Sequence, residues 1–218
     1  MFHNGQVRFR QGIHVYRRIV PTTSAPASPP ATPSPATGAR ARTRQAILDA
    51  AVRALAEDPG VPLSRVADLA DVGRTTLHRY FPERDDLVTA VAAHAVTSIQ
   101  SAHLRARVDD GPALAALLRV AQEYLELGDL LTVLFTGAVP EDRWSQDPTN
   151  EVVLGALHAR GLQDGSLDPR FDAAWTLGVM WSALYLAWST VSAGEADRHA
   201  VVSDLLLTLE KALAAPPA

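Results

Sequence analysis

Residues 63–81 read LSRVADLADVGRTTLHRYF and contain two short helical segments, 63–70 and 74–81, separated by the turn Asp71-Val72-Gly73. Two such helices can pack nearly at right angles if the positions where they meet are apolar. Those positions here are Val66, Ala70, Val72, Leu77 and Tyr80, with the small Ala67 at the closest approach. Asp71 occupies the turn position that needs a left-handed backbone, which Asp tolerates better than most residues. The stretch therefore predicts a helix-turn-helix.

The outward side of the second helix carries hydrogen-bonding side chains and no carboxylate: Arg74, Thr75, Thr76, His78 and Arg79. When such a helix enters the major groove of DNA, its first residues meet the base edges. We expect Arg74 to bond guanine O6 and N7, and Thr75 and Thr76 to bond bases or phosphates. His78 and Tyr80 lie on the sides of the helix and are expected to contact phosphates. Arg79 is expected to contact either a base or a phosphate. The alternative is that Arg74 and Arg79 are ordinary solvated residues.

The charge of the chain is unevenly distributed. Residues 1–44 carry seven Arg and no Asp or Glu, whereas residues 87–218 carry sixteen acidic and eight basic residues. A basic end on an acidic body is typical of a terminus that faces a polyanion such as DNA. Arg40 and Arg42 precede the first predicted helix and Arg44 stands at its start, where all three can reach phosphates or an adjacent minor groove. Charge alone equally allows a basic tail that binds nothing.

Helical periodicity continues downstream of this motif, without strand-like alternation. Upstream, residues 1–39 are expected to be a disordered basic, Pro-rich extension, because residues 21–38 hold six prolines. Thr43 is the expected N-cap of the first helix, and Asp168, followed by Pro169, that of the eighth. The sequence predicts nine helices: 43–57, the two of the motif, a long one from Pro82 to about Val108, then about 113–127, 129–137, 149–161, 169–192 and 196–214.

These elements predict an all-α chain with two domains, a helix-turn-helix domain at 40–86 and a second helical domain at 87–214. Cysteine is absent, which excludes disulfides, thiolate metal sites and a cysteine nucleophile. No stretch has the length of a transmembrane helix or the form of a signal peptide, so we expect a cytoplasmic protein without a membrane partner. We find no catalytic motif and no cluster with metal-ligand spacing, and expect no enzyme activity, metal or cofactor.

Residues 41–97 resemble the N-terminal domain of the tetracycline-repressor (TetR) family of transcriptional regulators. The resemblance is carried by the first helix ILDAAVRAL, the turn approach VADLADV, and TTLHRYFPERDDLV, which matches the recognition helix and the acidic start of the fourth helix. Gly73, Thr75, His78 and Pro62 depart from the residues usual in the family. The resemblance implies that Arg84, at a position where Lys is usual, meets a DNA phosphate. It also implies that the last two helices pair with those of a second copy.

Several aromatic and histidine residues are candidates for an effector pocket. Trp181, Tyr185 and Trp188 share one face of the eighth helix, and Trp175 lies on another. This spacing fits either a core or dimer interface or the wall of an apolar pocket. Trp144 stands alone in a polar loop, as a lid or a surface anchor. By family analogy His94 and His158 are pocket candidates, and a lone His is also commonly a structural group.

The combined interpretation is a homodimeric repressor that binds a pseudo-palindromic operator in double-stranded DNA. We expect a small apolar or aromatic effector to release it, from a cavity that the eighth helix shares with the long fourth helix near Val91, His94 and Ala95. Since residues 171–191 and the Leu stripe 202–213 hold more apolar surface than a monomer needs to bury, we expect an obligate dimer. The alternatives are a dimer that binds DNA without any effector and a transcriptional activator.

Overall fold

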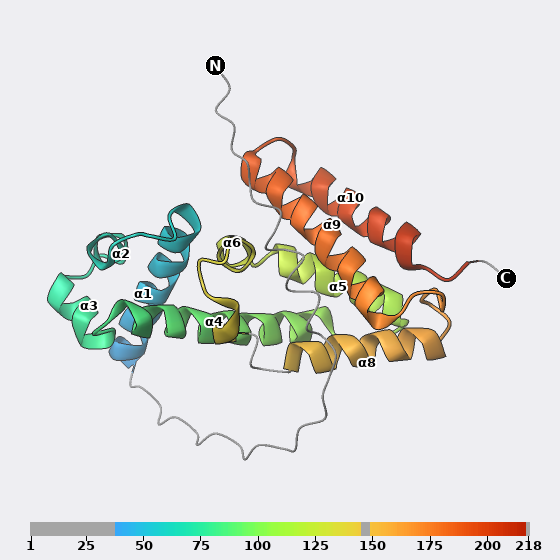
Figure 1. Cartoon of the computed structure of the whole chain (residues 1–218), viewed down its shortest axis with the longest axis horizontal. Helices are drawn as coiled ribbons and strands as arrows, with labels where there is room; N and C mark the ends of the chain where they lie inside the picture. Colours follow the sequence, from blue (N-terminus) through green and yellow to red (C-terminus); the bar gives the residue numbers. More distant parts are fainter. Residues whose placement is uncertain (1–37, 145–148, 217–218) are drawn as a thin grey trace, which may run out of the picture.

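The computed structural model describes residues 38–144 and 149–216, and this part of the chain contains ten helices and no strand (Figure 1). The helices are α1 (Gly38–Glu57), α2 (Leu63–Leu69), α3 (Arg74–Tyr80), α4 (Arg84–Ala106), α5 (Ala113–Leu125), α6 (Asp129–Phe135), α7 (Glu141–Trp144), α8 (Thr149–Gln163), α9 (Ala173–Ala193) and α10 (Arg198–Leu213). The all-α prediction is confirmed. The predicted count of nine was one short, because α7 is a single turn with too few residues to show a helical period.

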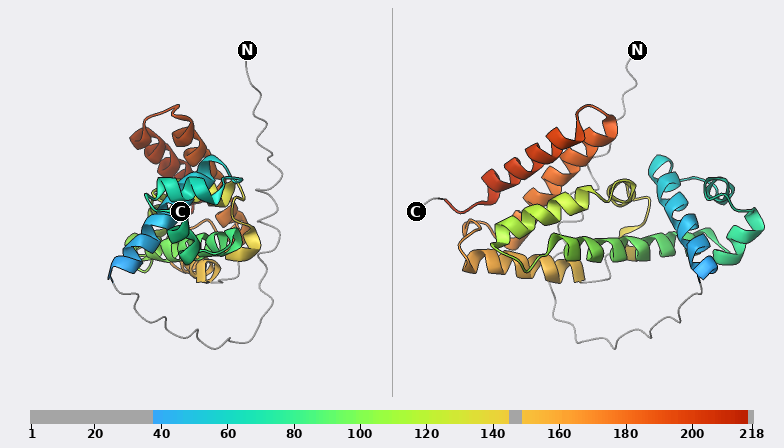
Figure 2. Two further views of the ribbon diagram at one scale, coloured as in Figure 1. Left: turned by 90° about the vertical axis from the view of Figure 1, so that its left-hand side faces the viewer. Right: turned by 180° about the vertical axis from the view of Figure 1, so that it is seen from behind.

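Helices α1–α3 gather at one end of an elongated molecule, and α4 runs from them toward the other end (Figures 1 and 2). Helix α5 packs on α4, on α8 and on the antiparallel pair formed by α9 and α10. Helix α6 lies between α1 and α9 and contacts both. The short α6 therefore links the helix-turn-helix end with the bundle.

Two clusters of buried apolar side chains form the core. The first cluster joins α5, α8, α9, α10 and the second half of α4. The second cluster joins α1, α2, α3 and the first half of α4. Leu130 and Val133 of α6 belong to the second cluster and Leu131 to the first, so opposite sides of this helix are buried in different cores.

The two predicted N-caps were wrong. Helix α1 begins at Gly38, inside the region expected to be disordered, and the Thr43 hydroxyl donates to the Ala39 carbonyl within the helix. The rest of that region, residues 1–37, lies outside the described residues. Helix α9 begins after Asp172, whose carboxylate accepts the Trp175 N–H at 2.7 Å. Asp168 does not cap a helix, because its carboxylate binds Arg170.

Candidate DNA-binding and effector sites

The helix-turn-helix is built as the sequence predicts. Asp71 has a φ of 53°, in the left-handed region, and the next N–H, of Val72, donates to the Ala67 carbonyl at 3.0 Å. Val66, Ala67 and Leu77 are buried where α2 and α3 meet. The extended Gly73 precedes α3. These contacts fix the direction in which α3 presents its outer side.

The outer side of α3 is polar, and its two charged residues are both arginines. Arg74, Thr75, His78 and Arg79 are exposed, and Thr76 and Tyr80 are half-buried. His78 Nδ1 lies 3.2 Å from the Pro82 carbonyl oxygen, which fixes its ring near the end of the helix. Arg74, Thr75 and Arg79 thus project into solvent from the outer side of α3.

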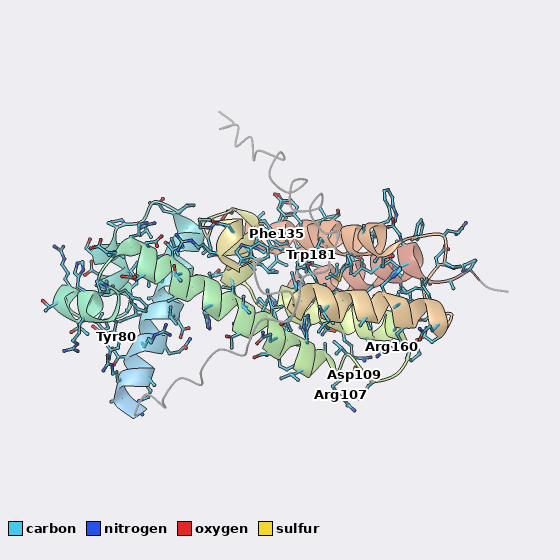
Figure 3. The ribbon with its side chains drawn as sticks, turned by 60° about the horizontal axis from the view of Figure 1, so that its bottom comes forward. Tyr80, Arg107, Asp109, Phe135, Arg160 and Trp181 are labelled. Atoms are coloured by element: carbon cyan, nitrogen blue, oxygen red, sulfur yellow. The ribbon has the colours of Figure 1, made fainter. Side chains whose placement is uncertain are left out.

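Tyr80 connects the end of α3 with the start of α1. The guanidinium groups of Arg40 and Arg79 each lie 5.8 Å from the centre of the Tyr80 ring, a distance at which a cation is attracted to the ring. Ala39, Arg40, Thr43, Arg79 and Tyr80 surround a surface hollow of about 430 Å³. Tyr80 lies at the end of the molecule that the first three helices form (Figure 3).

The first turns of α1 add further positive charge to this end. Arg42 is exposed, and the Arg44 guanidinium lies 5.5 Å from the centre of the Phe81 ring. Because α1 begins earlier than predicted, Arg40, Arg42 and Arg44 stand on a helix and not on a loose tail. Their positions relative to α3 are therefore fixed by the fold.

Arg84 is directed into the protein. Its guanidinium donates hydrogen bonds to the carbonyl oxygens of Pro59 and Val61, in the connection between α1 and α2. A contact with a phosphate would require it to leave both carbonyls. Next to Arg84, the Glu83 carboxylate accepts the backbone N–H of Asp86, and the Asp86 carboxylate accepts the backbone N–H of Glu83. These two hydrogen bonds form a capping box at the start of α4.

The candidate effector residues of α4 and the aromatic residues of α9 pack in different clusters. Val91 and Ala95 are buried in the second cluster, among side chains of the helix-turn-helix end, and His94 is half-buried. Trp181, Tyr185 and Trp188 instead face α5 and α6. The residues expected to share a cavity thus belong to different clusters, and a cavity common to α4 and α9 stays a prediction.

Five rings from three helices form what we call the aromatic cluster: Tyr124 of α5, Phe135 of α6, and Trp181, Tyr185 and Trp188 of α9. Trp181 stacks on Tyr124 with centroids 5.3 Å apart, and Phe135 meets Tyr185 edge-on at 5.3 Å. Figure 3 shows Phe135 beside Trp181. Trp188 Nε1 donates to the Thr132 hydroxyl of α6 at 2.9 Å. The sequence did not identify Tyr124 or Phe135, because each is an isolated aromatic residue on its helix.

Helix α4 reaches this cluster through a buried polar chain. His103 Nε2 lies 2.6 Å from the Tyr124 hydroxyl, which in turn donates to Asn150 Oδ1 at 2.6 Å. Burial lowers the pKa of His103, because the charged imidazolium loses hydration there, and a hydrogen bond with Asn150 partly opposes this effect. Burial also raises the pKa of the Tyr124 hydroxyl, which therefore stays protonated. The sequence gave no sign of this chain.

The remaining candidates lie apart from the aromatic cluster. Trp175 is 61% exposed and stacks on Phe171. His158 is buried, with Nε2 at 3.2 Å from the Phe171 carbonyl oxygen, as expected of a structural histidine. Trp144 packs against the second cluster, close to α4. Within residues 38–144 and 149–216, no group of three metal-ligating side chains comes together, and no helix is long and apolar enough to cross a membrane.

The turn at Asp71, the polar outer side of α3 and the arginines around Tyr80 define a helix-turn-helix DNA-binding protein. Residues 47–91 match the family model described as bacterial regulatory proteins, tetR family. The repressor LfrR of Mycolicibacterium smegmatis is 34% identical over 189 residues, covering 85% of this chain and 97% of LfrR. The repressor KstR of Mycobacterium tuberculosis is 27% identical and covers 81% of this chain and 88% of KstR.

A solved structure shows the same relationship. The crystal structure of LfrR from Mycobacterium smegmatis in complex with proflavine has a TM-score of 0.62 and 36% identity, covering 79% of this chain and 96% of that one. The chain belongs to the TetR family, whose members are regulators and not enzymes, and it is a transcriptional repressor of that family.

Proposed function

We propose that the chain binds a pseudo-palindromic operator as a homodimer and leaves it when a planar aromatic effector binds the bundle. The observation that carries the DNA-binding part is the exposed outer side of α3, which bears two arginines and no carboxylate. In this proposal residues 40–86 are the DNA-binding domain and residues 87–214 the regulatory domain.

Base reading is assigned to the start of α3. Arg74 contacts a guanine. Thr75, Thr76 and Arg79 each contact a base or a phosphate. Phosphates are held by the residues beside them: Arg40, Arg42, Arg44, His78 and Tyr80. Because α1 and α3 are joined through Tyr80, these phosphate contacts orient the helix in the groove.

The dimer face is assigned to the outer sides of α9 and α10. Leu186 of α9 and Leu207 of α10 are 66% and 46% exposed, and Trp175 lies on the same side of α9 as Leu186. These helices lie together at one edge of the bundle (Figure 2). A two-fold pairing through this face would bury large apolar side chains on four helices and place two copies of α3 on one side of DNA.

The effector site is assigned to the aromatic cluster. The LfrR structure holds proflavine, a planar aromatic cation. Here the half-buried rings of Trp181, Tyr185 and Trp188 offer faces on which such a molecule can stack, and an aromatic face attracts a cation. The excess of acidic residues in 87–218 also favours a cation over an anion.

The test begins with selection of the operator from random duplex DNA by the purified full chain. Proflavine is then titrated into the complex while anisotropy of labelled DNA is followed. We expect a selected inverted repeat and release of DNA by proflavine. Binding of the repeat without any release by proflavine or other planar cations would favour the regulator without an effector. Absence of any selected sequence would contradict the whole proposal.

Arg74→Ala is the matched test of base reading. We expect it to weaken specific binding by about 1–3 kcal/mol and to relax the preference at one base pair of each half-site. Arg53→Ala is the control, because Arg53 is exposed on α1 outside the proposed DNA contacts. Unchanged affinity and unchanged preference in Arg74→Ala would refute the assignment of Arg74 to a base.

A further inference from the structure

We propose that Arg143 of α7 is a positioning residue that transmits movement of α6 to the start of α4, and so couples the aromatic cluster to the DNA-binding end. This inference rests on the proposed function and adds the route by which an effector acts. The route runs through the contact of Arg143 with Asp85 and Thr89, which we call the α4–α7 contact.

Helix α6 is placed to sense a ligand in the aromatic cluster. Its Phe135 ring contacts Trp181, Tyr185 and Trp188, with centroids between 5.3 and 6.2 Å apart. The rings already touch, so a planar molecule that inserts between Phe135 and its neighbours must displace one of the rings. Phe135 is the ring carried by the shortest helix in the cluster, a helix of seven residues.

The opposite side of α6 is buried against the DNA-binding end. Leu130 is 4% exposed and Val133 is fully buried, both in the second cluster with α1 and α4. Val139, between α6 and α7, is buried in the same cluster. Because close-packed cores do not compress, a shift of α6 must displace its neighbours or carry α7 with it.

Helix α7 is tied to the first two turns of α4. The Arg143 guanidinium binds both carboxylate oxygens of Asp85, at 2.7 and 3.1 Å, and donates to the Thr89 hydroxyl at 2.6 Å. Trp144, the next residue, packs against the second cluster. The two side chains thus hold α7 on α4 from both the solvent side and the core side.

The α4–α7 contact acts at a sensitive position. Asp85 lies in the first turn of α4, four residues after Phe81 and the end of α3. Its neighbour Arg84 binds the carbonyls of Pro59 and Val61, before α2. A displacement of the first turn of α4 therefore also displaces α2 and α3. A bidentate ion pair at the surface is directional, and it is also weak enough to break during regulation.

The test measures coupling, defined as the ratio of operator Kd with saturating proflavine to operator Kd without it. We expect Arg143→Ala to lower this ratio about threefold to tenfold relative to wild type while proflavine still binds. Asp85→Asn should lower it similarly, and the double variant no further, because both remove one contact. Arg105→Ala is the control, since it breaks the Arg105–Glu123 ion pair of α4, far from α7, and should leave the ratio unchanged.

A second measurement needs no effector. Hydrogen exchange of the amides of residues 85–90 should be faster in Arg143→Ala than in wild type and Arg105→Ala. Unchanged coupling and unchanged exchange in Arg143→Ala would overturn the α4–α7 contact as a route while leaving the proposed function intact. If proflavine fails to bind wild type, the effector assignment is wrong, and the exchange rates still decide whether Arg143 positions α4.

Discussion

The Arg84 guanidinium stabilises the junction of α4 with the connection between α1 and α2, through the carbonyls of Pro59 and Val61. Hydrogen bonds from a charged donor contribute more than neutral ones, so we expect Arg84→Ala to lower the free energy of unfolding by about 1–2 kcal/mol. Urea unfolding measures this loss. The slope of operator affinity against salt should not change, because no phosphate contact is lost. Unchanged stability with a slope lower by about one would instead identify the phosphate contact implied by the family resemblance.

His103 makes stability depend on pH. Burial lowers its pKa in the folded protein, so the unfolded chain binds a proton more readily. The neutral ring therefore contributes stability that is fully present above the unfolded pKa of about 6.5 and is lost as pH falls toward the folded pKa. We expect wild type to lose stability more steeply than His103→Gln when the pH is lowered from 7.5 to 5.5. Parallel losses in the two proteins, measured by urea unfolding, would contradict this.

At the scale of elements, Gly161 allows α8 to approach the segment that follows it. A Cβ at Gly161 would lie 2.4 Å from Leu167 Cδ1, and Leu167 is itself buried. We expect Gly161→Ala to lower the free energy of unfolding by about 1–3 kcal/mol, because the packed core cannot make room. Gly155→Ala is a matched control on the same helix, where a Cβ meets nothing within 4 Å. It should be neutral or stabilise by up to about 1 kcal/mol. Equal effects of the two changes on thermal unfolding would refute this reading of Gly161.

The helices also differ in how well the sequence predicts them. The helix-turn-helix was predicted because its constraints are local: Asp71 tolerates the turn, and α2 and α3 are neighbours in the chain. The starts of α1 and α9 were mistaken because Thr43 and Asp168 have good capping chemistry, yet Thr43 binds within the helix and Asp168 is taken by Arg170. Local preference could not choose between Asp168 and Asp172.

The aromatic cluster was predictable only in part. The face shared by Trp181, Tyr185 and Trp188 is a periodic signal, but the partner rings Tyr124 and Phe135 come from helices distant in sequence. Their contacts depend on how α5 and α6 pack beside α9, which no spacing in the sequence encodes. The contact of Arg143 with Asp85 could not be predicted either, because the two residues are 58 positions apart in the sequence.

For the whole molecule, burial distinguishes the leucines of the proposed dimer face from those of the core. Leu205 and Leu209 of α10, in the Leu stripe that suggested dimerisation, are buried within one copy. We therefore expect Leu186→Asp with Leu207→Asp to give a folded monomer with greatly weakened operator binding, because one copy of α3 makes half the contacts. Light scattering after gel filtration measures the mass. Leu104→Asp is the control, at a leucine of α4 that is 80% exposed and outside this face. A dimeric double variant would place the interface elsewhere.

The central claim is that two copies of α3, held at a fixed separation by one dimer, read the two halves of one operator. It is tested most directly by measuring the affinity of the full chain for its selected operator with five base pairs inserted between the half-sites. Such an insertion turns one half-site by about half a helical turn of DNA, so the two major grooves no longer face the same dimer. The account predicts that specific affinity falls to that of a single half-site. Equal affinity for the original and the lengthened operator would contradict it.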